Sequence, residues 1–255
     1  MTAKYRVLIT GATSAIGGAL AREYAAPGVT LYLHGRHAER LQEMATACQG
    51  LGAEVVTMRL DMRDFTALRA WLEDLGPLDL VIINAGMNTH IGPNGEPEPW
   101  HEVEALLDVN LKAAMLIVQA VLPAMQARGC GQIALVSSLA AYFGLPVTPT
   151  YCATKAGLKA YGEALRGWLA PHGIKVNVIM PGYVKSPMCD AMPGPKPFLW
   201  PPERAAKAIR RGLARDKARI SFPFPLNWGT WWLAVLPAAL STNILRWLGF
   251  APGER

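Results

Sequence analysis

The sequence predicts an α/β fold, a doubly wound parallel sheet in a single domain with an apolar C-terminal extension. Short apolar runs rich in β-branched residues alternate with longer helical segments over most of the chain. Strands this apolar suit a parallel sheet that helices cover on both faces, and the alternation predicts right-handed crossovers. The 255 residues, 51% hydrophobic and 17% charged, are enough to bury a full core and argue against disorder.

The expected elements follow one another in a regular order. The strands are residues 5–10, 29–33, 54–58, 80–83, 133–136, 174–179 and 218–222. The helices are residues 16–26, 37–49, 63–75, roughly 100–128 and 151–169, and Pro or Gly residues follow the first and third of them. We therefore expect one domain over residues 1–222 and a hydrophobic, Trp-rich extension over residues 223–255.

The charge of the chain limits the kinds of partner. The formal net charge is +6 and the isoelectric point about 9.3, which favours anionic ligands such as dinucleotide phosphates, or an acidic membrane surface. Lys and Arg are spread along the sequence, so we expect no nucleic-acid partner. The densest basic run, residues 204–219, is interpreted as the solvated face of a helix.

The cysteines point to a reducing compartment. Cys48, Cys130, Cys152 and Cys189 form no CxxC pair and have no His cluster near them in the sequence. We therefore expect neither a metal site nor a disulfide framework, and a cytoplasmic location. The apolar stretch of residues 7–9 is too short for the hydrophobic region of a secretory signal.

A loop of small residues, residues 10–17, joins the first strand to the first helix. Small side chains allow the backbone to approach a pyrophosphate, and the helix N-terminus presents free N–H groups to that anion. Many strand-to-helix turns have a similar composition, so the loop alone is weak evidence. Its position at the start of a βαβ pattern favours dinucleotide binding in a Rossmann fold.

A candidate acid–base cluster lies further along the chain. Tyr151 and Lys155 are four residues apart on one expected helix, so they share a face. A neighbouring cation lowers the pKa of a tyrosine from about 10, toward proton exchange with a substrate oxygen. Alone, the pair is equally compatible with a core tyrosine and a surface lysine. Ser138 follows the fifth strand, at the sheet edge where α/β proteins bind ligands, and Asn110 lies in the long helix.

In this order and spacing, Asn110, Ser138, Tyr151 and Lys155 resemble the active site of the short-chain dehydrogenase/reductase family. The loop also resembles that family's TGxxxGxG motif, except that Ala15 stands where Gly is usual. We expect cofactor binding to survive this change if the φ angle of Ala15 is negative. The resemblance covers about residues 4–222, which implies that residues 1–222 form a dinucleotide-binding and catalytic domain.

The resemblance implies a role for each of the four residues. Tyr151 is the general acid in reduction and the general base in oxidation. Lys155 lowers the pKa of Tyr151 and bonds the nicotinamide ribose. Ser138 holds and polarises the substrate oxygen, and Asn110 holds a water that links Lys155 to solvent.

The resemblance also implies the cofactor site. Asp61 bonds the adenine, the segment of Asn84 supports the sheet and lines the cofactor, and the segment after the sixth strand contacts the nicotinamide amide. The full set of expected cofactor residues is Gly11, Thr13, Ser14, Ala15, Ile16, Gly17, Arg36, Asp61, Met62, Asn84, Ala85, Gly86, Tyr151, Lys155, Pro181, Gly182, Val184 and Ser186.

The end of the second strand indicates which nicotinamide nucleotide is bound. An acidic residue there bonds a ribose 2′-OH, but this chain has Gly35 at that position, followed by Arg36. An Arg forks well onto a phosphate, so NADP(H) is favoured over NAD(H). The alternative is that Arg36 faces solvent at the start of a helix.

Two later segments are expected near the substrate or outside the core domain. Prolines exclude a regular helix through the middle of residues 186–200. The side chains of Met188, Met192, Phe198 and Trp200 in this segment form either an apolar roof over the substrate or plain packing on the sheet.

Residues 222–250 hold one charge, Arg246, and four tryptophans. Pro237 argues against a simple membrane span and for a helical hairpin on a membrane surface; an oligomer contact or packing on its own domain are the alternatives.

These features together predict an NADP(H)-dependent carbonyl reductase for an apolar or bulky carbonyl or alcohol substrate. We expect a homodimer or homotetramer in the cytoplasm, with peripheral contact to the inner face of a membrane. The alternative is a non-catalytic dinucleotide-binding regulatory or scaffold protein, against which the intact Asn110, Ser138, Tyr151 and Lys155 argue. A sugar-nucleotide epimerase would resemble a longer chain with a separate substrate lobe.

Overall fold

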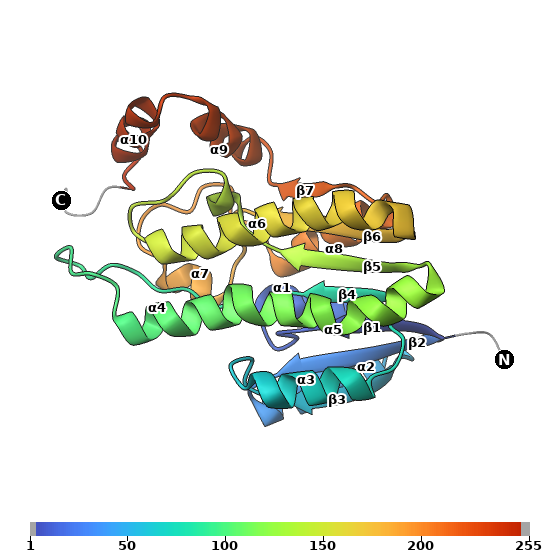
Figure 1. Ribbon diagram of the computed structural model, residues 1–255. Coiled ribbons are helices and arrows are strands. Elements are labelled where there is room, and N and C mark those ends of the chain that lie inside the picture. Colours follow the sequence, from blue (N-terminus) through green and yellow to red (C-terminus); the bar gives the residue numbers. More distant parts are fainter. Residues whose placement is uncertain (1–3, 251–255) are drawn as a thin grey trace.

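The structure, a computed structural model, describes residues 4–250 (Figure 1). Within these residues seven parallel strands form one sheet in the order β3-β2-β1-β4-β5-β6-β7, which confirms the doubly wound fold. The order reverses between β1 and β4, and ligands of such sheets bind at the carboxyl ends beside that point. The strands are β1 (Tyr5–Ile9), β2 (Val29–Gly35), β3 (Glu54–Arg59), β4 (Leu80–Ile83), β5 (Gly131–Val136), β6 (Ile174–Pro181) and β7 (Arg219–Phe222).

Helices cover both faces of the sheet with separate apolar cores. One core includes Leu20 and Met44 against the sheet, and the other includes Leu68 and Ile117. The first face carries α1 (Ala15–Tyr24), α2 (Ala38–Gln49) and α8 (Pro202–Ala214). The second face carries α3 (Phe65–Asp74), α4 (Trp100–Leu107), η1 (Asp108–Lys112), α5 (Ala113–Arg128) and α6 (Pro149–Leu169). The four basic residues of the run that lie in α8, Arg204, Lys207, Arg210 and Arg211, are exposed, which confirms a solvated helix face; the other three follow the helix.

The long helix expected over residues 100–128 is interrupted. A π-helical turn, η1, separates α4 from α5 and places the buried side chain of Asn110 on its inner side. Apolar periodicity did not reveal this turn because apolar residues continue through it: Val109 and Leu111 of the turn pack on the same core as Ile117 of α5. By length and composition the run Trp100–Arg128 could cross a membrane. Within it, Ile117, Val118 and Met125 are buried in the core of the domain.

After β7 the chain forms a helical hairpin over the carboxyl end of the sheet, at the top of Figure 1. The hairpin consists of α9 (Leu226–Val235) and α10 (Ala238–Trp247), and the hydroxyl of Ser241 donates to the Leu233 carbonyl at 2.8 Å between them. Leu226 packs against Leu139 and Met180, so the hairpin rests on its own domain. Residues 251–255 of the expected extension lie outside the described residues. The remaining short helices are η2 (Leu139–Ala141), η3 (Ala170–His172) and α7 (Pro187–Ala191).

Candidate active site

The loop between β1 and α1 is packed so closely that it tolerates only small residues. Gly11 has a φ of +66°, and a Cβ there would lie 2.9 Å from the Ala85 Cα. A Cβ on Gly17 would lie 2.2 Å from the Gly11 carbonyl oxygen. Ser14 caps α1 by accepting a hydrogen bond from the Gly17 N–H at 3.1 Å. Ala15 is the first residue of α1 and has no positive φ, so its methyl group is accommodated.

Asn84 holds this loop to the end of β4. Its side-chain amide donates to the carbonyls of Thr10 and Gly11 and to the Ser14 hydroxyl, at 3.0 to 3.1 Å. The Thr10 hydroxyl in turn accepts from the backbone N–H groups of Asn84 and Ala85, both at 3.0 Å. The side chain that the sequence placed in the cofactor site therefore also fixes the shape of the phosphate loop.

His34 is a second support of the loop, which sequence reasoning missed. Its Nδ1 accepts from the Gly11 N–H at 3.2 Å, and its Nε2 donates to the Leu60 carbonyl at 2.9 Å. Burial lowers the pKa of His34, so the neutral ring with its proton on Nε2 is the form that satisfies both partners. No sequence motif marks this role, because it depends on the alignment of β2 with β1 and β3.

At the far end of the groove, Arg36, His37 and Arg40 line the cavity beside the carboxyl end of β2. Arg40 was not among the expected residues. A Cβ on Gly35 would lie 2.8 Å from the Thr13 Cγ2, so a side chain at that position would meet the phosphate loop. The Asp61 carboxylate is paired with the Arg63 guanidinium, which holds the pKa of Asp61 at about 2.

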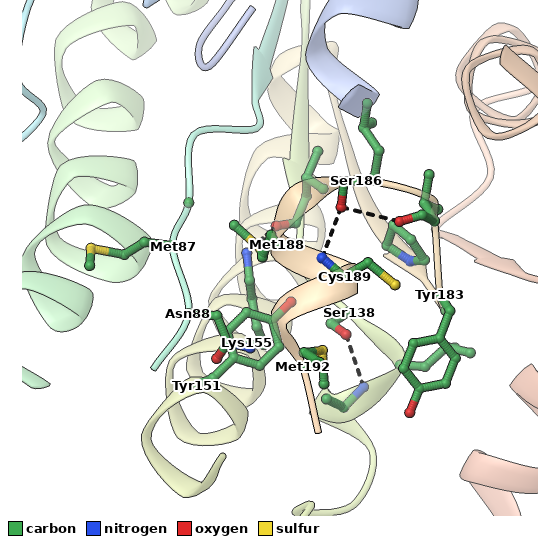
Figure 2. Close-up of a pocket in the computed structure, with 18 of the residues that line it drawn as sticks. Met87, Asn88, Ser138, Tyr151, Lys155, Tyr183, Ser186, Met188, Cys189 and Met192 are labelled. Atoms are coloured by element: carbon green, nitrogen blue, oxygen red, sulfur yellow. Dashed lines mark hydrogen bonds between the residues drawn. The ribbon is translucent and has the colours of Figure 1, made fainter. Parts of the chain in front are cut away.

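Ser138, Tyr151 and Lys155 meet where β5 and α6 face the same cavity (Figure 2). Lys155 is only 4% exposed, and its Nζ donates to the Val136 carbonyl at 2.8 Å. That Nζ lies 5.6 Å from the centroid of the Tyr151 ring. The Ser137 hydroxyl donates to the Lys155 carbonyl at 2.7 Å, which ties α6 to the end of β5. The Ser138 hydroxyl accepts from the Ala140 N–H at 3.1 Å.

Burial dominates the pKa values of this pair. It raises the pKa of Tyr151 to about 12, although a hydrogen bond with Ser138 lowers it, and it lowers the pKa of Lys155 to about 8. In the protein alone the pKa of Tyr151 is therefore raised overall, and the expected lowering by Lys155 stays a prediction. Removing both groups from water disfavours phenolate and ammonium alike. Tyr151 consequently keeps its proton at neutral pH, as a proton donor must.

Among the described residues the side chain of Asn110 makes hydrogen bonds to Met87 and Thr154, not to Lys155. Its Oδ1 accepts from the Met87 N–H at 2.9 Å, and its Nδ2 donates to the Met87 carbonyl at 3.0 Å and to the Thr154 hydroxyl at 3.1 Å. A Cβ on Gly86 would lie 3.2 Å from the Asn110 Oδ1 and 3.5 Å from the Lys155 Nζ. The side chain thus joins the π-turn, the segment after β4 and α6 directly behind the reaction centre.

The segment after β6 forms the other wall. Ser186 caps the short helix α7 by accepting from the Cys189 N–H at 3.0 Å, which aims Met188 and Met192 at the cavity (Figure 2). Of the four residues expected to form a roof, only these two line the cavity. Phe198 is half-exposed outside the cavity, and Trp200 stacks on Phe222 at 5.0 Å. Trp200 is held there because its backbone pairs with Tyr183 and Lys185.

These groups line one cavity of about 730 Å³ that runs from the phosphate loop to the hairpin. All expected catalytic and cofactor residues line it except Gly17 and Asn110, which lie directly behind its wall. The close-packed glycines and the capped start of α1 fit a pyrophosphate, so the cavity can hold a dinucleotide with its reactive end beside Tyr151.

Asn88 is another lining residue that sequence reasoning missed, and it is labelled in Figure 2. Its Oδ1 accepts from the Thr148 hydroxyl at 2.7 Å and from the Thr89 N–H at 2.9 Å. Its Nδ2 is buried without a protein partner. These bonds fix the orientation of the amide, so the unpaired donor is a stable feature of the site.

Comparison with known proteins agrees with this geometry. The sequence matches the family model described as short chain dehydrogenase over residues 5–194. An uncharacterized oxidoreductase of Myxococcus xanthus is 36% identical over 237 residues, which cover 91% of this chain and 93% of that protein. A 3-dehydrosphinganine reductase of Arabidopsis thaliana is 36% identical over 189 residues, which cover 72% of this chain and 56% of that protein. The solved short-chain dehydrogenase from Sphingobium yanoikuyae in complex with NADPH has the same fold, with a TM-score of 0.80, 24% identity and 95% coverage of each chain.

The buried lysine predicts a measurable pH dependence of stability. Lys155 has a pKa of about 8 when folded and the ordinary 10.5 when unfolded, so the unfolded chain binds the extra proton between these values. The free energy of unfolding therefore gains up to about 1.4 kcal/mol per pH unit above pH 8 from this group, and loses it as the pH falls through 8. We expect urea unfolding from pH 7 to about pH 10, below the titration of the tyrosines, to show a smaller rise for Lys155→Met than for the native chain. Parallel curves for the two proteins would mean that the ammonium is not desolvated.

Proposed function

The chain belongs to the short-chain dehydrogenase/reductase family of oxidoreductases, and we propose that it is an NADP(H)-dependent carbonyl reductase for an apolar, bulky substrate. One observation carries the proposal: the protonated phenol of Tyr151 and the hydroxyl of Ser138 face a cavity that is continuous with the dinucleotide groove. The Arabidopsis relative is named a reductase, which supports this direction of reaction.

In the proposed reaction the nicotinamide, when bound, supplies the hydride that reaches the carbonyl carbon. Tyr151 donates its phenolic proton to the carbonyl oxygen, so the product is the alcohol. Ser138 hydrogen-bonds the same oxygen and polarises it for attack. Lys155 lies close enough to stabilise the phenolate left on Tyr151. Asn110 positions Met87 and α6 behind these groups.

The preference for NADP(H) rests on the basic end of the groove. Arg36, His37 and Arg40 line the cavity there. Gly35, at the position where an acid would bond a ribose 2′-OH, has no side chain to repel a 2′-phosphate. Two guanidinium groups beside this position suit a phosphate dianion.

The outer face of the hairpin supports a peripheral membrane contact. Trp228, Trp232 and Trp247 are exposed on it, and residues 223–245 contain no Asp, Glu, Lys or Arg. Exposed apolar patches mark interaction sites, and Trp is enriched where proteins meet the membrane interface. We propose that this face docks the enzyme, as a cytoplasmic homodimer or homotetramer, on an anionic lipid surface, to which its net charge of +6 is complementary.

Removal of the proton donor tests the reaction and separates it from a scaffold role. We expect Tyr151→Phe to lower kcat for carbonyl reduction at least about a hundredfold, in line with general acid catalysis. NADPH binding, measured by fluorescence, should change little. If turnover stays within about threefold of the native enzyme, Tyr151 is not the acid.

A pair of substitutions tests the cofactor preference. We expect Arg36→Ala to weaken NADPH binding at least about tenfold and to change NADH binding less than about twofold, because NADH has no 2′-phosphate. Calorimetric titration of both nucleotides gives the ratio, and Arg40→Ala reports the share of the second guanidinium. Equal losses for NADPH and NADH would contradict the assignment.

Flotation with anionic vesicles tests the membrane contact. The native chain should float with phosphatidylglycerol vesicles at low salt, and the triple change of Trp228, Trp232 and Trp247 to Ser should leave most of the protein in the soluble fraction. Trp168→Ser is the matched control, since Trp168 is equally exposed but lies on α6. If the native chain does not float, and the triple variant instead dissociates an oligomer, the face is a subunit contact.

A further inference from the structure

The hairpin presents two apolar stripes that face opposite ways. On α9, Leu226, Gly229, Thr230 and Leu233 line the cavity, at the spacing of one helix face. Ile244, Leu245 and Leu248 of α10 extend the same wall. On α9, Trp228 and Trp232 each follow a residue of the inner stripe by two positions, so they point to the opposite side of the helix.

The inner stripe borders open space rather than a packed core. No residue of α9 is fully buried, and Leu226 and Leu233 are only half-buried although they face the molecule. A Cβ added to Gly229 would meet nothing within 4 Å. A helix that is apolar on all sides is normally buried. Because α9 is not buried, its inner side leaves room for an apolar ligand.

The lining of the cavity changes from charged to apolar along its length. Its charged side chains are Arg36, Arg40 and Asp61 at the nucleotide end and Lys155 at the reaction centre. The apolar part of the lining comes from the hairpin, from Leu139, Phe143 and Leu145, and from Met188 and Met192. Methionine side chains adapt their shape to apolar ligands.

We propose that the inner face of α9–α10 binds the hydrocarbon chain of the substrate, and that the substrate is a ketone with a long unbranched alkyl chain. The inference rests on the proposed reductase function and specifies its substrate class. The ketone carbon lies at Tyr151 and Ser138, and the chain runs beneath the hairpin. The α9 stripe spans the eight residues 226–233, about 10 Å of helix, which suits an extended chain better than a compact ring system.

The length of the alkyl chain provides the first test. With saturating NADPH, kcat/KM is measured for methyl ketones from hexanone to tetradecanone. Burial of each added methylene should raise kcat/KM by up to about fourfold until the channel is filled. If the enzyme reduces hexanone but gains nothing with chain length, the inference is overturned while the reductase function stands. If it reduces no ketone of the series, the reductase function itself fails.

Substitutions on the two sides of α9 provide the second test. Gly229→Leu places a side chain in the channel, so kcat/KM for tetradecanone should fall at least about tenfold while that for hexanone stays within about twofold. Ala234→Leu is the matched control on the exposed side of the same helix and should leave the whole series unchanged. An equal loss for short and long ketones in Gly229→Leu, with an unchanged melting temperature, would overturn the chain-binding role.

Discussion

The arrangement of the active site depends on keeping the Lys155 ammonium out of water. Among the hydrogen bonds of the described residues, its Nζ donates to the Val136 carbonyl and to no carboxylate. A buried cation without a counter-charge is costly unless its hydrogen-bond acceptors are held in place around it. The Ser137 hydroxyl fixes the backbone of Lys155, and Asn110 fixes Thr154 one residue before it. The same contacts that hold the lysine therefore align β5, α6 and the π-turn, which together place Tyr151.

The sequence alone was sufficient for the sheet and for the residues that the structure brings together in the candidate active site. Apolar runs of four to six residues reveal strands of a parallel sheet because both faces are buried, and the order of Asn110, Ser138, Tyr151 and Lys155 is specific. The contacts that depend on register or on a local helical defect could not be read from it. His34 reaches Gly11 only because β2 lies beside β1, and the π-turn leaves the apolar pattern of the long helix intact.

The pKa of Tyr151 shows a second limit of reasoning from the sequence. Spacing on a helix showed that Tyr151 and Lys155 are neighbours, and a neighbouring cation lowers the pKa of a phenol in solvent. Spacing gives no measure of burial, and in this site burial has the larger effect on both groups. Likewise, composition marked residues 223–250 as apolar but could not divide them into a cavity side and an exposed side. That division needs the position of α9 over Leu139 and Met180.

The hairpin follows the last strand of the sheet, so it lies outside the segments that form the phosphate loop and the nucleotide groove. The match to the family model ends at residue 194, before β7 and both helices of the hairpin. No strand follows the hairpin in the described part of the chain, so its sequence can drift without disturbing the sheet or the phosphate loop. If the proposed chain-binding role holds, nucleotide binding and substrate choice rest on different stretches of the chain, and residues 223–250 can be redesigned for a new ketone without altering the phosphate loop.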